Sequence, residues 1–156
     1  MSFRFPFPLE VALIDDEEGI LDLLGDAVEG IPELTPLLYS NPVEAFEAIK
    51  ERKIRIVFTD LDMPNLRGDQ LIQKCKKLDW NVDVIVMSAA IKREIALKCF
   101  DTGAREVLIK PSDISRVDEA LNRIVERYKI WHSTCNEVGF GIQDRTILKM
   151  NGDEEI

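Results

Sequence analysis

Five polar residues stand directly after short apolar runs of the chain, and their side chains could do chemistry together. They are Asp15 and Asp16, Asp60, Ser88 and Lys110. Three carboxylates crowded into one place repel one another unless a divalent cation holds them, and a set of oxygen ligands suits Mg²⁺. One hydroxyl and one ammonium are suitable donors to the oxygens of a phosphoryl group. The set therefore predicts a magnesium-dependent phosphoryl site, with the Asp60 carboxylate as a nucleophile that forms an aspartyl phosphate.

Such a site requires elements that bring these residues to one place. Five apolar runs have the length of strands: Leu9–Ile14, Leu34–Tyr39, Ile54–Thr59, Val82–Met87 and Glu106–Ile109. Pro36 cannot donate to a ladder on both sides, so the second strand is expected at an edge of the sheet. Each run is followed by a segment with helical spacing of apolar residues. Alternation of this kind predicts a doubly wound α/β domain with a parallel sheet, whose strand ends share one ligand-binding edge.

The helical stripes also predict which side chains are buried. In the first helix the stripe comprises Ile20, Leu23, Leu24, Ala27 and Val28, and in the fourth Ile91, Ile95, Cys99 and Phe100. The last and longest stripe comprises Ile114, Val117, Leu121, Ile124, Tyr128 and Trp131. Its alternating spacing of three and four favours either packing on the sheet or self-association as a homodimer through this helix.

Four motifs in chain order resemble those of the receiver domain of two-component response regulators. They are Leu13-Ile14-Asp15-Asp16-Glu17, Val57 to Pro64 with Gly68 eight residues after Asp60, Met87-Ser88-Ala89, and Gly103-Ala104 followed by Leu108-Ile109-Lys110-Pro111. The resemblance covers about residues 9 to 130. It implies a flavodoxin-like sheet with strand order 2-1-3-4-5 and helices on both faces.

The resemblance also implies a role for each site residue. Asp60 would accept phosphate from a phosphohistidine on a sensor histidine kinase or a histidine phosphotransfer protein. Asp15, Asp16, Asp60 and the backbone carbonyl of Asp62 would hold Mg²⁺. Lys110 and Ser88 would contact the phosphoryl oxygens, and Ser88 would move to act as a switch. Catalysis would be limited to the domain's own phosphorylation and dephosphorylation. At the second switch position the family usually has an aromatic ring, and this chain has Val107.

Two other functions remain open at this point. Asp60-Leu61-Asp62 could be the nucleophile and acid of a haloacid-dehalogenase-like phosphatase, although that family has its metal-binding acids downstream and Asp15 and Asp16 lie upstream. Alternatively, the chain could be a receiver-like protein-binding module that works without phosphate. Our main expectation is a stand-alone receiver that signals to an unknown downstream protein through a changed docking surface.

Composition limits the class of protein further. The chain has 156 residues and a formal net charge of −9, so we expect no nucleic-acid partner. It shows neither a signal peptide nor an apolar stretch of membrane-spanning length, which predicts a cytoplasmic protein without membrane contacts. Three widely spaced cysteines favour reduced, buried thiols. The expected organisation is a leader at 1–8, a receiver domain at 9–131, and an interaction tail or disordered extension at 132–156.

Overall fold

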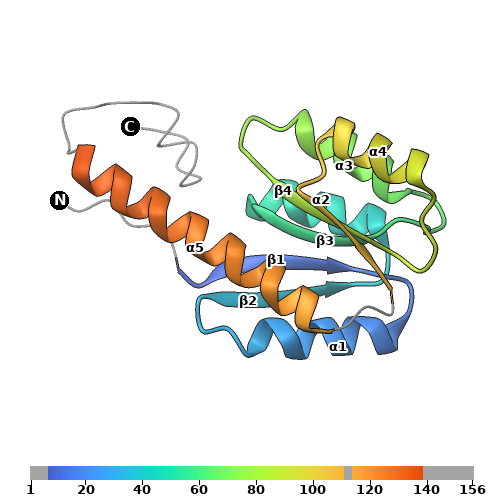
Figure 1. Ribbon diagram of the computed structural model, residues 1–156, viewed down its shortest axis with the longest axis horizontal. Helices are drawn as coiled ribbons and strands as arrows, with labels where there is room; N and C mark the ends of the chain where they lie inside the picture. Colours follow the sequence, from blue (N-terminus) through green and yellow to red (C-terminus); the bar gives the residue numbers. More distant parts are fainter. Residues whose placement is uncertain (1–6, 111–113, 139–156) are drawn as a thin grey trace.

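The computed structural model describes residues 7–110 and 114–138. Five strands and five helices alternate along these residues (Figure 1). In chain order they are β1 (Leu9–Ile14), α1 (Glu18–Glu29), β2 (Leu34–Tyr39), α2 (Pro42–Arg52), β3 (Ile56–Asp60), α3 (Gly68–Lys76), β4 (Asp83–Ser88), α4 (Arg93–Thr102), β5 (Glu106–Ile109) and α5 (Ile114–Val138). All strand pairs are parallel, in the order β2-β1-β3-β4-β5. The predicted doubly wound, flavodoxin-like fold is confirmed, and β2 with Pro36 lies at an edge as expected.

The ends of two strands differ from the sequence expectation in a way that matters for the site. β3 begins at Ile56 and includes Asp60, and β4 includes Ser88, so both polar residues are the last residues of their strands. The ladder extends this far because Asp60 is paired with Met87 and Ser88 with Ile109. The backbone conformation of both site residues is therefore fixed by pairing with a neighbouring strand.

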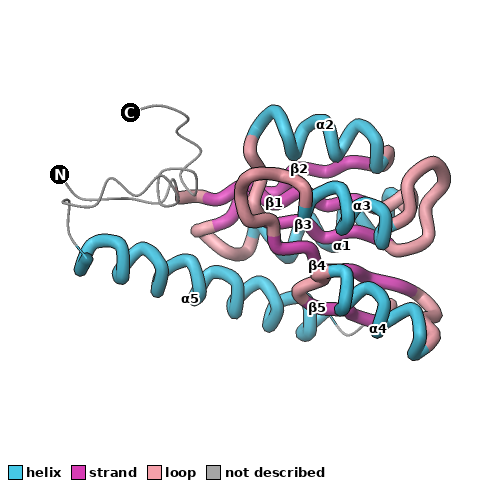
Figure 2. Tube along the Cα trace, turned by 90° about the horizontal axis from the view of Figure 1, so that it is seen from above, coloured by secondary structure: helices cyan, strands magenta, loops and turns pink. Residues whose placement is uncertain are grey.

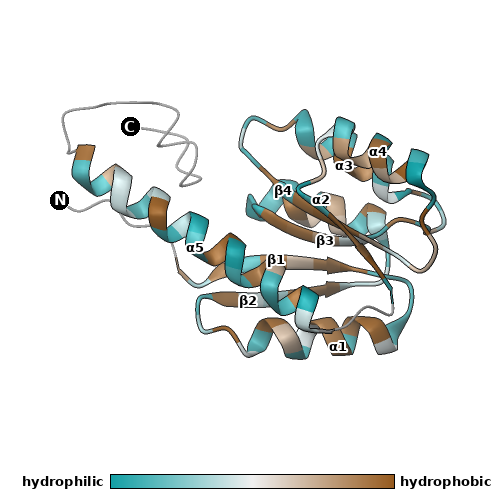
Figure 3. Ribbon diagram, viewed as in Figure 1, coloured by the Kyte–Doolittle hydropathy of each residue, from teal (hydrophilic) through white to brown (hydrophobic). Residues whose placement is uncertain are grey.

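The sheet separates two apolar layers. Side chains alternate along β1, so that Val11 and Leu13 pack with α1 and α5 while Ala12 and Ile14 pack with α2, α3 and α4. Figure 2 shows α5 on the side of the sheet opposite α2. The strands are hydrophobic along most of their length, and hydrophilic residues predominate on the outer sides of the helices (Figure 3). Because the central strands are buried on both faces, their sequences are continuous apolar runs.

Two of the predicted helical stripes are wrong in detail. In α1 the face that contacts the sheet is formed by Leu21, Leu24 and Val28. Leu21 is therefore buried in place of the predicted Leu23, which is 50% exposed. In α4 only Cys99 is buried, and the predicted core residue Phe100 is 66% exposed. α4 covers the edge strand β5, where the sheet offers less apolar surface than it does at its centre.

The last helix extends beyond the sheet. Val117, Leu121, Ile124 and Tyr128 are buried as predicted, but Trp131 is 46% exposed. α5 continues as a helix to Val138, past the domain boundary predicted at Trp131, and its C-terminal part projects away from the strands (Figures 1 and 2). The rest of the predicted tail, from residue 139, and residues 1–6 of the leader lie outside the described residues.

Two expectations from composition can be compared with the described part of the chain. Cys75, Cys99 and Cys135 are free and buried, as predicted. Burial raises the pKa of the Cys75 thiol to about 12, so this thiol stays protonated at neutral pH. Between residues 7 and 138, gaps excepted, no helix is both long and apolar enough to cross a membrane.

Candidate functional site

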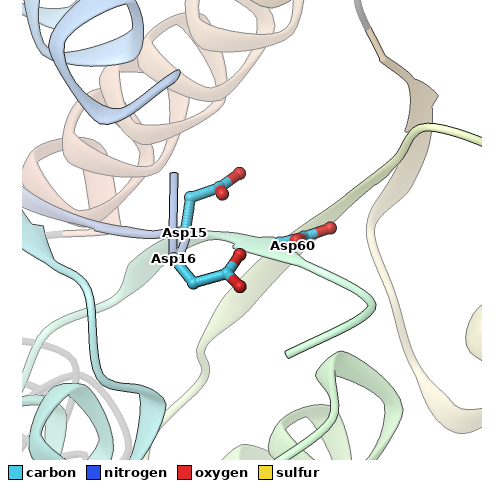
Figure 4. A group of neighbouring side chains, drawn as sticks. All are labelled: Asp15, Asp16 and Asp60. Atoms are coloured by element: carbon cyan, nitrogen blue, oxygen red, sulfur yellow. The ribbon is translucent and has the colours of Figure 1, made fainter. Parts of the chain in front are cut away.

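Three carboxylates meet where β1 and β3 end. These strands are neighbours, and Ile14 is paired with Thr59, so the next residues lie side by side: Asp15 directly after β1 and Asp60 at the end of β3. Asp15, Asp16 and Asp60 each place a carboxylate oxygen within 4.8 Å of the other two (Figure 4). Asp15 and Asp60 are buried, while Asp16 is exposed to solvent. The topology thus brings together the three acids that the sequence predicted as metal ligands.

Lys110 provides the positive charge of this cluster. It follows β5, and its backbone N–H donates to the carbonyl of Ser88 at 2.7 Å, which fixes it beside the end of β4. Its Nζ lies 2.5 Å from Asp15 Oδ2 and 3.4 Å from Asp60 Oδ2. The contact with Asp15 is the shorter of the two. The second oxygen of Asp15 accepts a hydrogen bond from the backbone N–H of Glu17 at 2.9 Å.

The pKa values of the two central groups follow from this arrangement. Burial raises the pKa of Asp60; Lys110 opposes this rise, and the nearby Asp15 adds to it. Burial alone would lower the pKa of Lys110, but its hydrogen bond to Asp15 and the charges of Asp15 and Asp60 raise it. The ammonium is therefore firmly protonated, and the raised pKa of Asp60 is caused mainly by its burial.

Ser88 is fully buried at the end of β4, next to the strand that carries Asp60. Within the described residues its Oγ has no hydrogen-bond partner. A buried hydroxyl without a partner is uncommon, because leaving it unpaired costs about 1–3 kcal/mol. Its position at the acidic edge is consistent with a hydroxyl that binds a ligand oxygen.

The loop after β3 packs closely against the end of that strand. Its side chains Leu61, Met63 and Leu66 are buried, and Gly68 donates its backbone N–H to the carbonyl of Leu61 at 2.9 Å. A Cβ on Gly68 would lie 2.7 Å from the carbonyl oxygen of Asp60. The first residue of α3 must therefore be glycine to approach the backbone of Asp60 this closely.

We expect Gly68→Ala to lower the free energy of unfolding by about 1–3 kcal/mol, because the new methyl group would contact backbone that cannot move away without shifting Asp60. Gly19→Ala is the matched control, since no atom lies within 4 Å of a Cβ at this position in α1. The control should be neutral or stabilising by up to about 1 kcal/mol. Urea unfolding of both variants measures the difference, and equal stabilities would contradict the prediction.

Two predicted residues remain, Asp62 and Val107. The backbone of Asp62 hydrogen-bonds to the Asp60 carboxyl group, which opposes the rise that burial causes in the pKa of Asp60. The side chain of Asp62 is 64% exposed, and its Oδ1 is 3.7 Å from Nη1 of Arg67. Val107 lies on β5, half buried against the layer that contains α3 and α4. Charged residues that the sequence prediction did not select connect this region to α4, namely Arg67, Asp69 and Lys98. In the sequence these three residues resemble ordinary exposed charged residues, so no local pattern predicted that they interact.

Comparison with known proteins gives similar sequences over most of the chain. Chemotaxis protein CheY of Thermotoga maritima is 32% identical over 114 residues, which are 73% of this chain and 95% of that protein. The DNA-binding transcriptional regulator NtrC of Escherichia coli is 28% identical over 119 residues, which are 76% of this chain. The match covers 25% of NtrC, so the chain spans about a quarter of the length of that relative.

Solved structures have the same fold. A response regulator receiver domain protein from Clostridium thermocellum superposes with a TM-score of 0.71 at 28% identity, covering 79% of this chain and 98% of that one. The beryllofluoride-activated NtrC4 receiver domain dimer superposes with a TM-score of 0.70 at 28% identity, covering 76% and 98%. Residues 11–122 match the response regulator receiver domain family. This range includes the ends of the four strands β1, β3, β4 and β5 that form the site. This chain therefore belongs to the receiver domains of two-component response regulators.

Proposed function

We propose that this receiver domain accepts a phosphoryl group on Asp60 from a phosphohistidine. The observation that carries the proposal is the single ammonium of Lys110, which contacts both Asp15 and Asp60 in a cluster of three carboxylates. The proposed donor is a sensor histidine kinase or a histidine phosphotransfer protein, the partners that response regulator relatives imply.

In the proposed reaction, a carboxylate oxygen of Asp60 attacks phosphorus in line. The new O–P bond forms as the P–N bond to the imidazole breaks, and the leaving nitrogen takes the electron pair and is then protonated. Lys110 stabilises charge on the phosphoryl oxygens, and Ser88 donates its Oγ–H to one of them. Asp60 attacks as its carboxylate, so the proposed reaction uses no further catalytic base.

The residues present fit a Mg²⁺ ion. Asp15, Asp16 and Asp60 supply only oxygen ligands, and the backbone carbonyl of Asp62 is the proposed fourth protein ligand. When bound, the ion would neutralise negative charge shared by the carboxylates and the phosphoryl group. The exposure of Asp16 leaves this side of the cluster open to water.

Signal output is proposed to start at Ser88 and to reach Val107 and a downstream protein through a changed docking surface. Ser88 and Val107 lie on the neighbouring strands β4 and β5, which supports a connection through the pairing of these strands. We keep 9–131 as the proposed receiver unit, with the extension from 132 as a separate element. A cytoplasmic role is also proposed. A role without nucleic-acid binding remains part of the proposal, supported by the net charge of −9.

Self-association through α5 is also part of the proposal. Ile130, Trp131 and Val138 are apolar and at least 46% exposed on the projecting part of this helix. One similar solved structure is described as a receiver domain dimer. Sedimentation of the full chain over a range of concentrations, with Ile130→Lys as the comparison, would measure this association.

The phosphoacceptor proposal is tested by incubating the full chain with Mg²⁺ and a small phosphodonor such as acetyl phosphate. We expect a mass increase of one phosphoryl group per chain, located on the peptide that contains Asp60, and its loss in alkaline hydroxylamine. Omission of Mg²⁺ should prevent the increase. A folded, metal-binding protein without this label would contradict the proposal and favour a phosphorylation-independent module. Multiple turnover of phosphomonoesters would instead favour the phosphatase alternative.

A further inference from the structure

A chain of alternating charges leads from the acceptor loop to α4. It consists of Asp62, Arg67, Asp69 and Lys98. We propose that Asp69 is a positioning residue that couples the acceptor loop to α4 by holding Arg67 and Lys98 at the same time. This inference rests on the proposed phosphorylation of Asp60 and adds the route by which that event reaches α4.

Asp69 is at the centre of the contacts. Its Oδ1 accepts a hydrogen bond from Arg67 Nε at 3.2 Å, and its Oδ2 lies 3.4 Å from Lys98 Nζ. The opposite side of the Arg67 guanidinium faces Asp62, whose Oδ1 is 3.7 Å from Nη1. Arg67 is therefore shared between an acid two residues after Asp60 and an acid that is paired with α4.

Burial separates Asp69 from ordinary surface ion pairs. Its side chain is only 12% exposed, whereas those of Arg67 and Lys98 are 48% and 62% exposed. Burial alone would raise the pKa of Asp69, but the hydrogen bonds from Arg67 and Lys98 outweigh it and lower the pKa. A buried carboxylate depends on its partners more than an exposed one, so a change at one cation affects how strongly Asp69 holds the other.

The two ends of this connection differ in rigidity. Asp69 follows Gly68, which is packed against the backbone of Asp60 and Leu61, so the start of α3 is fixed to the acceptor strand. α4 is held more weakly, since Cys99 is its only buried residue. In the described part of the chain, Lys98–Asp69 is the ion pair that connects α4 to the rest of the domain. The pair thus joins a fixed element to one that can move.

Phosphorylation would act on this chain through charge. Conversion of the Asp60 carboxylate to an acyl phosphate adds about one negative charge next to Asp62. This charge attracts the Arg67 guanidinium and weakens its hydrogen bond to Asp69. Lys98 then becomes the main cation of Asp69, and the tie to α4 strengthens. Val107 on β5 has no polar atom, so this route does not depend on it.

Hydrogen exchange of α4 tests the inference, measured in Mg²⁺ with and without beryllofluoride, an analogue of the phosphoryl group. In the native sequence we expect exchange in α4 to slow by about fivefold on addition, the lower end of usual coupling factors. Asp69→Asn and Lys98→Gln should each lose this response, and Lys98→Arg should retain it. Lys92→Gln, which removes an exposed lysine that precedes α4, is the matched control and should respond as the native chain does.

Fluorine NMR of bound beryllofluoride separates this inference from the proposed function. If the variants bind the analogue and α4 responds as in the native chain, Asp69 does not couple the two regions and the inference is wrong. If the native chain itself does not bind the analogue, the proposed function fails and the coupling fails with it. Lys98 is mostly exposed, so Lys98→Gln is expected to fold and to decide the result even if Asp69→Asn does not.

Discussion

Replacement of Asp60 by Asn should abolish phosphoryl labelling completely and, at the same time, stabilise the metal-free protein. Labelling is lost because the amide is a poor nucleophile and carries no negative charge. Stability should rise by about 1 kcal/mol, since one of three mutually repelling acids becomes neutral without a change of volume. Phosphodonor labelling and urea unfolding without Mg²⁺ measure the two effects.

The pH dependence of the same variant has a definite sign. The pKa of Asp60 is raised above its ordinary value of 3.8, first by burial and further by Asp15, with Lys110 opposing. The folded state therefore binds this proton more tightly than the unfolded state does. The cost of the charged form is fully present above the folded pKa and disappears as the pH falls through it toward 3.8. Asp60→Asn should lack this gain in stability on acidification.

Asp101→Asn is the control for both measurements. It removes the negative charge of an exposed side chain in the last turn of α4. This variant should still be labelled, and its metal-free stability should change by less than about 0.5 kcal/mol. Labelling of Asp60→Asn at the native rate would show that another residue is the acceptor.

Replacement of Lys110 by Met has the second largest expected effect. The side chain is 6% exposed and pairs with Asp15 and Asp60, so its removal leaves two buried carboxylates without their cation. We expect the metal-free protein to lose about 3 kcal/mol of unfolding free energy, because breaking a buried pair leaves an uncompensated charge. The labelling rate should fall by about 100-fold through loss of a donor to the phosphoryl oxygens.

Mg²⁺ distinguishes these two consequences. Addition of the ion to Lys110→Met should recover much of the lost stability, because a cation again neutralises the carboxylates, but it should not recover the labelling rate. Lys77→Met, which replaces an exposed lysine at the end of α3, is the matched control and should leave both quantities unchanged. Native labelling by Lys110→Met would contradict the role proposed for the ammonium.

Local patterns in the sequence were sufficient for the architecture. Apolar runs bounded by polar residues located all five strands, because strands covered on both faces must be apolar along their length. Pro36 placed β2 at an edge, since it lacks the backbone donor that a central strand needs. Parallel order then required Asp15, Asp16, Asp60, Ser88 and Lys110 to share one edge of the sheet.

Other features depended on contacts between elements that are distant in the chain. Whether Leu21 or Leu23 is buried was decided by the angle at which α1 rests on the sheet, and Phe100 is exposed because α4 covers an edge strand. The shorter contact of Lys110 with Asp15 than with Asp60 was likewise set by the packing of side chains at the end of the sheet. The pairing of Asp69 with Lys98 had no sequence signal, since ion pairs between helices depend on distances that only packing sets.

The sequence by itself determined the edge at which the acids gather and the chemical types of the groups there, because these follow from periodicity and chain order. The order of the strands was implied by the resemblance of the four motifs to the receiver family. The tertiary structure alone decided which oxygen each cation contacts, which side chains remain exposed and how far α5 extends as a helix. Those properties depend on distances of a few ångströms between packed elements, and such distances are set by the whole core at once.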